Sequence, residues 1–344
     1  MIKLVIVGFG AMGRKTTEEL LLNENIELVS IVDKNPEFKN KYSSDYITCN
    51  KDVPIKKSIE EVNWESVDLA IVMSASFITQ IEPLLIELAN RKVNILTIAE
   101  EMSYPEVANE KISRKIDEIA KKNNITILGT GVNPGFVLDY LIITLSNVCL
   151  EIEEIEARRV NDLSEFGETV FRSQGIGLTK SQFQAGVKDG SVVGHVGFKQ
   201  SIHLIGKALN WELIDFKEEK SPILAEKTVE TKEFKFKKNI VVGCNHRAYA
   251  TFTGNKKIIL EHPQQICVDG YPETKDEIIF KGTPDLNLKI EPEIQGGIAT
   301  VAMTINMIPL IIEAKSGLIT LLELPKIPAM FNKNIIKKLH KEEV

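Results

Sequence analysis

The first 130 residues alternate short apolar runs with amphipathic helical segments, and this alternation limits the fold of the 344-residue chain more than any other feature. A strand that is apolar on both faces must be buried on both, which indicates a parallel sheet covered by helices on each side. We therefore predict an α/β, Rossmann-type, doubly wound domain. The runs that predict its strands lie at 2–7, 26–33, 45–48, 68–73, 93–98 and 125–128.

The pattern changes after Gly129, where longer strands replace the regular alternation. Strands are expected at 152–160, 239–242, 256–260 and 298–305, and helices at 136–148 and 194–209. This mixture predicts a C-terminal α+β domain with an open mixed sheet. We assign residues 1–135 to a dinucleotide-binding domain, with 306–344 packing back on it, and residues 136–305 to a substrate-binding and dimerisation domain.

Composition excludes several classes of partner. Charged residues make up 26% of the chain and the net charge is −6, so no broad basic surface predicts nucleic-acid binding. The chain opens on an apolar strand rather than a signal peptide, and no apolar run of about 18 residues predicts a membrane span. The four cysteines and five histidines show no metal-ligand spacing. We expect a cytoplasmic protein without a metal, without nucleic acid and without a membrane partner.

A glycine-rich motif joins the first strand to the first helix. Gly8 permits a tight turn, Gly10 lets the main chain approach a pyrophosphate, and Gly13 allows close helix–strand packing. The free N–H groups and positive dipole end of the following helix favour phosphates. A glycine turn without a ligand is the alternative. The full motif that is expected to contact the cofactor is Gly8, Phe9, Gly10, Ala11, Met12 and Gly13.

The context of this motif predicts NAD or NADP as the cofactor. Asp33 ends the second strand about 20 residues after the last glycine, where an acid binds the adenosine ribose hydroxyls. Its carboxylate would repel a 2′-phosphate, which favours NAD somewhat, although Lys34 offers a compensating charge. Ser74 and Ala75 follow another strand and are expected to line the nicotinamide ribose, unless this segment only caps the next helix.

Two adjacent acids, Glu100 and Glu101, follow the strand at 93–98. Oxidation of an amine requires a neutral nitrogen, and hydrolysis of the resulting iminium requires an activated water. One carboxylate with a raised pKa can do both, and Glu100 is preferred because it is nearer the strand. The alternative is the acidic first turn of a helix. The absence of a lysine here argues against a hydroxyl substrate.

The turn Asn133-Pro134 lies between glycines after the last strand of the first domain. Asn133 is expected to bind the nicotinamide carboxamide or the substrate, and the alternative is a structural hinge. In the second domain Arg172 is a candidate clamp for a substrate carboxylate, with Gln174 in the same loop. His195 is a candidate hydrogen-bonding or proton-shuttling group. An exposed arginine and a packing histidine are the alternatives.

With these segments, the chain resembles the 2,4-diaminopentanoate dehydrogenase family, which includes native amine dehydrogenases and whose fold resembles that of dihydrodipicolinate reductase. The blocks that carry the resemblance are Gly-Phe-Gly-Ala-Met-Gly at 8–13, Glu-Glu-Met-Ser-Tyr-Pro at 100–105, Gly-Val-Asn-Pro-Gly-Phe at 131–136, Gly-Ile-Gly-Leu-Thr at 175–179, Gly-His-Val-Gly at 194–197, Asn-Met-Ile-Pro at 306–309 and Ser-Gly-Leu-Ile-Thr at 316–320.

The resemblance implies NAD(P)-dependent oxidative deamination of 2,4-diaminopentanoate at C4, giving 2-amino-4-oxopentanoate and ammonia in ornithine degradation. It also implies a homodimer and a catalytic glutamate at position 100 or 101. The chain lacks the His-His pair of dihydrodipicolinate reductases, which argues against that activity. Another amine or amino-acid dehydrogenase, and a non-catalytic NAD(H) sensor, are the alternatives, and no basic helix-turn-helix supports the sensor.

Overall fold

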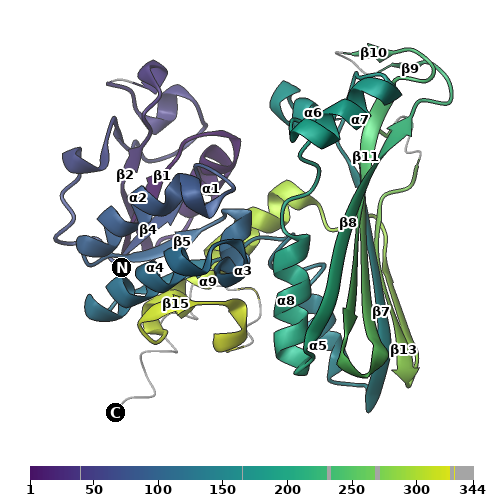
Figure 1. Cartoon of the computed structure of the whole chain (residues 1–344). Helices are drawn as coiled ribbons and strands as arrows, with labels where there is room; N and C mark the ends of the chain where they lie inside the picture. The colour runs from purple at the N-terminus through teal and green to yellow at the C-terminus, as the bar shows by residue number, and fades with distance from the viewer. Residues whose placement is uncertain (39, 165, 231–233, 268–271, 326–328, 330–344) are drawn as a thin grey trace. The chain divides into compact units, whose positions relative to one another are not determined.

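The computed structural model describes residues 1–38, 40–164, 166–230, 234–267, 272–325 and 329. The chain divides into two compact units (Figure 1). Unit 1 joins Met1–Gly135 to Gly296–Val344, and unit 2 is the continuous segment Phe136–Gln295. Much of the segment 306–344 lies outside the described residues.

Unit 1 is built on a parallel sheet. Among the described residues it has seven strands in the order β15-β6-β5-β4-β1-β2-β3, and each neighbouring pair is parallel. Strand β4 is buried along its length and β1 is buried from Leu4 to Val7, because helices cover both faces. The predicted doubly wound sheet is confirmed. The strands are β1 Ile2–Val7, β2 Ile26–Val32, β3 Ile55–Lys56, β4 Leu69–Val72, β5 Asn94–Thr97, β6 Thr126–Gly129 and β15 Gly317–Ile319.

Two pairs of helices cover this sheet. Helix α2 packs against α4, and α1 packs against α9, which also contacts β5 and β6. Leu85 on α2 and Ile116 on α4 enter one hydrophobic core with Val72 and Ile95 of the sheet. The helices of unit 1 are α1 Ala11–Leu21, α2 Ile78–Asn90, α3 Pro105–Ala108, α4 Glu110–Lys122 and α9 Gly296–Glu313.

Two strand predictions are wrong. The expected strand at 45–48 is absent from this described segment, where a short 3-10 turn covers Ser43–Asp45 and the third strand is β3. The expected strand at 298–305 is the first half of α9. Its residues are apolar on nearly every side, and such a run has no period that separates a strand from a buried helix. At 18 residues α9 is long and apolar enough to cross a bilayer, but 44% of it is buried in the protein.

Unit 2 is built on a mixed sheet. The described residues form six strands in the order β14-β13-β7-β12-β11-β8, antiparallel except for the pair β12–β7. The predicted open mixed sheet is confirmed. The strands are β7 Glu151–Asp162, β8 Leu213–Leu224, β11 Val241–Phe252, β12 Lys256–Gln265, β13 Lys275–Thr283 and β14 Leu286–Ile290, with a separate hairpin of β9 Val229–Glu230 and β10 Lys235–Phe236.

Helices cover one face of this second sheet in two groups. Helix α7 packs by Phe183 against Val241 and Cys244 at the start of β11. Helix α8 lies over the rest of β11, from Phe198 beside His246 to Gly206 beside Phe252. The linker between α7 and α8 therefore crosses the sheet near the middle of β11. The helices of unit 2 are α5 Tyr140–Ser146, α6 Glu168–Ser173, α7 Lys180–Asp189 and α8 Phe198–Leu209.

Candidate active site

The glycine turn after β1 has the steric features of a dinucleotide cradle. Gly8 has φ +109°, and a Cβ there would lie 2.5 Å from the carbonyl oxygen of Met73. A Cβ on Gly13 would lie 2.1 Å from the Gly8 carbonyl oxygen. At Gly10 no described atom lies within 4 Å of the place that a Cβ would take, and no side chain caps α1 there. The space above Gly10 and the free N–H groups of α1 fit a pyrophosphate.

Asp33 ties the end of β2 to this turn. Its Oδ2 accepts a hydrogen bond from the Phe9 N–H at 2.7 Å, and its Oδ1 accepts one from the Asn35 N–H at 2.8 Å. Each carboxylate oxygen keeps a lone pair for a ribose hydroxyl, and the side chain is partly exposed. Lys34 is exposed beside it. The arrangement fits the adenosine ribose of a dinucleotide.

The sequence predicts that Phe9 contacts the cofactor, but the structure buries its side chain. Its ring is fully buried, 5.6 Å from the ring of Phe38 and 6.1 Å from that of Tyr46, and its N–H is bonded to Asp33. The guanidinium of Arg14 packs over all three rings, at 5.0 to 5.6 Å. The sequence did not predict this cluster, which stabilises the glycine turn through aromatic packing and cation–π contacts. Within the motif, Gly10, Ala11 and Met12 keep exposed surface.

Glu101 caps a helix. Its Oε2 accepts a hydrogen bond from the N–H of Ile78, the first residue of α2, at 2.8 Å, and its own N–H donates to the Ser76 carbonyl oxygen at 3.2 Å. The expected alternative, in which the segment Ser74–Ser76 caps α2, is wrong, because the N-cap residue is Phe77 and the cap comes from Glu101. A carboxylate fits this place because it faces the positive end of the helix dipole.

Glu100 is held differently. It begins a short 3-10 turn, Glu100–Ser103, and is partly buried. Burial raises the pKa of Glu100 above its ordinary value of 4.5, and the adjacent charge of Glu101 adds to the rise. Hydrogen bonds from its own main-chain N–H and from Ser76 act in the opposite direction. The result is a carboxyl group with a raised pKa at the carboxyl end of β5.

The last residue of β6 packs directly against this turn. A Cβ on Gly129 would lie 2.1 Å from the Met102 carbonyl oxygen, so only glycine allows the turn to approach β6 this closely. The loop after β6 continues into a cis Asn133–Pro134 peptide, in which Asn133 is partly buried and Pro134 is buried. The neighbouring parallel strands β5 and β6 therefore bring Glu100 and Asn133 to one edge of the sheet. This is the edge where open parallel sheets bind ligands.

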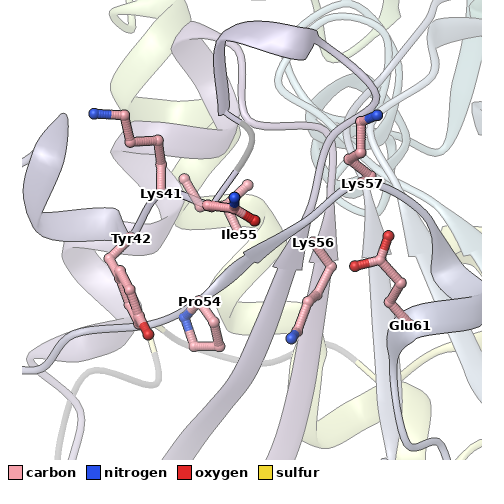
Figure 2. Close-up of a pocket in the computed structure, with 8 residues that line it drawn as sticks. Lys41, Tyr42, Pro54, Ile55, Lys56, Lys57 and Glu61 are labelled. Carbon is pink, nitrogen blue, oxygen red and sulfur yellow. The ribbon is translucent and has the colours of Figure 1, made fainter.

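A pocket of about 350 Å³ lies beside β3, lined by residues that include Lys41, Tyr42, Lys56 and Lys57 (Figure 2). It neighbours Asp33, whose N–H donates to the Lys56 carbonyl oxygen at 2.9 Å. The side chain of Lys56 extends away from those of Lys41 and Lys57, so the three ammonium groups do not converge on one point. We assign no ligand to this pocket.

The predicted site residues of unit 2 separate into one exposed residue and two buried ones. Arg172 lies at the end of α6 rather than in a loop after a strand, its side chain is 79% exposed, and it pairs with Glu168 at 2.7 Å. This placement favours the alternative of a surface arginine. Gln174 is buried, and its Nε2 donates to the Gly194 carbonyl oxygen at 3.1 Å. His195 is also buried and precedes α8, which begins at Phe198.

Sequence reasoning missed a polar row beneath His195. We use the name polar row for His246 on β11, His262 on β12, Arg159 on β7 and Asp276 on β13, all at least 97% buried. His246 pairs with His262 across two strands, and Arg159 with Asp276 across two more. Arg159 Nη1 lies 2.8 Å and 3.0 Å from the two oxygens of Asp276. The two strand histidines have no motif spacing in the sequence, and only the register of the sheet aligns them.

Comparison with known proteins identifies the family. The family model of the 2,4-diaminopentanoate dehydrogenase C-terminal domain matches residues 136–341. A 2,4-diaminopentanoate dehydrogenase of Acetoanaerobium sticklandii is 34% identical over 330 residues, which cover 94% of this chain and 93% of the relative. The chain belongs to the 2,4-diaminopentanoate dehydrogenase family. The predicted resemblance is thereby confirmed, and the protein is an oxidoreductase of the dehydrogenase class.

Solved structures confirm the fold. An amine dehydrogenase from Mycobacterium smegmatis superimposes with a TM-score of 0.85 at 20% identity, covering 95% of this chain and 97% of that one. A myo-inositol dehydrogenase from Lactobacillus casei, in complex with NAD(H) and myo-inositol, gives 0.52 at 13% identity, covering 84% and 74%. A TrkA-N domain family model also matches residues 4–120, which contain the glycine turn. Together with the turn itself, these findings support a nicotinamide cofactor.

Proposed function

We propose that this protein catalyses the NAD(P)-dependent oxidative deamination of 2,4-diaminopentanoate at C4, giving 2-amino-4-oxopentanoate, ammonia and the reduced cofactor. The observation that carries the proposal is the carboxyl group of Glu100, which has a raised pKa and lies at the ligand-binding edge of a sheet with a dinucleotide turn. The identity of the proposed substrate rests on the family model and on the relative from A. sticklandii.

The proposed chemistry uses Glu100 twice. Its carboxylate first takes a proton from the C4 ammonium, which leaves the nitrogen lone pair free to form a C=N bond. A bound nicotinamide cofactor would supply the acceptor for the hydride that leaves C4. After Glu100 has released that proton to solvent, its carboxylate takes a proton from a water that adds to C4 and passes it to the nitrogen, so that ammonia leaves as the ketone forms. A carboxyl pKa nearer to neutrality suits both proton transfers.

Other side chains would hold the reactants rather than react. Asp33 would bind the adenosine ribose, and Asn133 the nicotinamide carboxamide or the substrate. Asp33 favours NAD, because a 2′-phosphate would meet its charge, and the exposed Lys34 lessens this preference. Glu101 is a helix cap and leaves the catalytic role to its neighbour. We further propose a cytoplasmic homodimer that acts in ornithine degradation.

A screen of reduced-cofactor formation tests the proposed function. Purified protein is given NAD or NADP with 2,4-diaminopentanoate, simple amines, 2-amino acids, hydroxy acids and sugars, and absorbance at the reduced nicotinamide band is followed. We expect the largest kcat/KM with 2,4-diaminopentanoate and a higher value with NAD than with NADP. Oxidation of hydroxy acids or sugars without oxidation of any amine would refute the proposal.

Ser76→Ala is expected to move the acidic limb of the rate profile. The Ser76 hydrogen bond favours the charged form of Glu100, so its loss raises the pKa of a group whose pKa is already raised by burial. Because the base works when deprotonated, the rising limb of kcat/KM moves to higher pH, while the plateau stays within about threefold. Steady-state rates from pH 5 to pH 9 measure this, and a limb that stays in place or moves to lower pH contradicts the assignment.

A further inference from the structure

Arg14 is a charged residue beside the glycine turn that has no role in the chemistry proposed above. It lies on α1, and its N–H donates to the Gly10 carbonyl oxygen at 2.9 Å, one helical turn beyond the expected pyrophosphate. The side chain is partly exposed. Among the described residues the guanidinium makes one hydrogen bond, from Nε to the Phe9 carbonyl oxygen at 3.3 Å, and no ion pair. The N–H groups of its terminal nitrogens therefore have no partner there.

Three aromatic rings hold this guanidinium in place. Its carbon atom Cζ lies 5.6 Å from the ring centre of Phe9, 5.5 Å from that of Phe38 and 5.0 Å from that of Tyr46. The rings pack edge to face on one another, with the centres of Phe38 and Tyr46 4.9 Å apart. Contact with aromatic faces restricts the long side chain before any ligand arrives, so less freedom is lost on binding. Arg14 thus presents its terminal N–H groups as a preorganised fork.

The same contacts place Arg14 beside the proposed ribose site. Phe38 and Tyr46 belong to the segment that follows β2, which begins at Asp33. Phe9 is bonded to both charged groups, because its N–H donates to Asp33 Oδ2 at 2.7 Å and its carbonyl oxygen accepts from Arg14 Nε. The carboxylate and the guanidinium form no ion pair with each other in the described part of the chain. Each is therefore available to a different part of one ligand.

The adenosine end of NADP carries the two groups that this pair would recognise. Its ribose has a 3′-hydroxyl, which suits a carboxylate, and a 2′-phosphate, which suits the planar fork of a guanidinium. A phosphate monoester carries a charge of about −1.5 to −2 at neutral pH, so Asp33 alone would repel it. Lys34 is exposed, has no ring contact among the described residues and would lose more side-chain freedom on binding. Arg14 is therefore the better partner for the phosphate.

We propose that Arg14 binds the 2′-phosphate of NADP and is the residue that lets this dehydrogenase use NADP as well as NAD. Asp33 would accept the 3′-hydroxyl, and its charge keeps NAD the better cofactor. Phe9, Phe38 and Tyr46 act as positioning residues that hold the guanidinium. This inference rests on the dinucleotide site of the proposed function, and it does not depend on the amine substrate.

Arg14→Met tests the inference, because it keeps an unbranched chain over the rings and removes the guanidinium. Binding of NAD and NADP is measured by titration calorimetry. We expect the dissociation constant of NADP to rise by about 10- to 100-fold, the effect of losing hydrogen bonds to a charged group, and that of NAD by less than about threefold. An equal rise for both cofactors would overturn the inference, because it would indicate a structural role or a bond to the pyrophosphate. Unchanged binding of both would overturn it too.

Two nucleotide fragments separate this inference from the proposed function. Adenosine 5′-monophosphate and adenosine 2′,5′-bisphosphate differ only in the 2′-phosphate, and their binding needs neither nicotinamide nor turnover. We expect Arg14→Met to weaken binding of the bisphosphate by about 10- to 100-fold more than binding of the monophosphate. If no amine is oxidised, the proposed function fails while this comparison still decides the inference. An equal effect on the two fragments, or a wild-type protein that binds only the monophosphate, overturns it.

Arg91→Met is the matched control in the same unit. Arg91 also lies over an aromatic ring, with Cζ 5.9 Å from the ring centre of Trp64, but its guanidinium pairs with Glu87 at 2.8 Å at the end of α2. We expect this variant to bind both cofactors within about twofold of wild type. Lys34→Gln is expected to weaken NADP binding by less than about threefold. A loss of NADP affinity in either control as large as that in Arg14→Met would overturn the assignment.

Asp33→Asn tests the same pair from the carboxylate. The amide oxygen can still accept the Phe9 N–H, but the charge that opposes the phosphate is gone, so NADP binding should strengthen by up to about tenfold. Adding Arg14→Met should weaken NADP binding by at least about tenfold relative to Asp33→Asn alone. Equal NADP affinity in the single and double variants would show that Arg14 does not hold the phosphate.

Discussion

Glu100→Gln is expected to lower kcat for amine oxidation by about a thousandfold, within the range that general-base catalysis supplies. The amide is nearly isosteric and can still accept a hydrogen bond from Ser76, but it cannot take a proton from the substrate ammonium. The fall should appear in kcat and kcat/KM alike, because the lost interaction belongs to the transition state. Stopped-flow rates of reduced-cofactor formation measure it, with cofactor affinity from fluorescence as the check on folding.

Glu101→Gln is the matched control for this prediction. Its amide oxygen can still accept the Ile78 N–H, so the cap on α2 survives with less charge. We expect a rate within about tenfold of wild type. Loss of the adjacent charge should also lower the pKa of Glu100. Near-normal turnover by Glu100→Gln, or a greater loss of rate in Glu101→Gln, would show that Glu100 is not the catalytic base.

Gly10→Val should weaken dinucleotide binding by about 100-fold or more without unfolding the protein. The isopropyl group would occupy the space above the turn, where no described atom lies within 4 Å, so the fold has room for it. The pyrophosphate would have no room beside that side chain, because it needs the close approach to the main chain that glycine permits there. Gly10 has φ −70°, which valine tolerates, so the backbone adds no strain. Cofactor titration and the thermal unfolding midpoint measure the two effects separately.

Gly167→Val gives this experiment a matched control. Gly167 is also the N-cap of a helix, α6, with φ −84° and with no described atom within 4 Å of a Cβ. It lies in unit 2 and is distant from the glycine turn in sequence. We expect unchanged cofactor affinity there. Unimpaired NAD binding by Gly10→Val would mean that the turn after β1 does not hold the pyrophosphate.

The sequence predicted the parts of the fold that depend on local pattern. The apolar runs at 2–7 and 68–73 became buried parallel strands because their period and flanking helices left few other solutions. Glu100 was preferred over Glu101 by its place next to a strand. The structure supplies a physical reason, because the carboxylate of Glu101 is occupied by the start of α2.

The pairing of distant strands explains which features of the site could not be predicted from the sequence. His246 and His262 are 16 residues apart and become neighbours only through the pairing of β11 with β12. Arg159 joins them because β7 enters the sheet from a segment 87 residues before His246. A helix that is apolar all round, such as α9, has no amphipathic period to distinguish it from a strand. These features depend on contacts between segments distant along the chain.

The sheet of unit 1 is completed by both ends of the described chain. Strand β15 pairs with β6, Thr126 Oγ1 donates to the Ala314 and Lys315 carbonyl oxygens, and α9 packs on α1. During synthesis on the ribosome, the glycine turn therefore emerges some 300 residues before the segment that packs behind its helix. Unit 2 must be synthesised in full before unit 1 can finish folding. Until then, the β6 edge of the sheet and the face of α1 that contacts α9 stay uncovered in the nascent cofactor-binding unit.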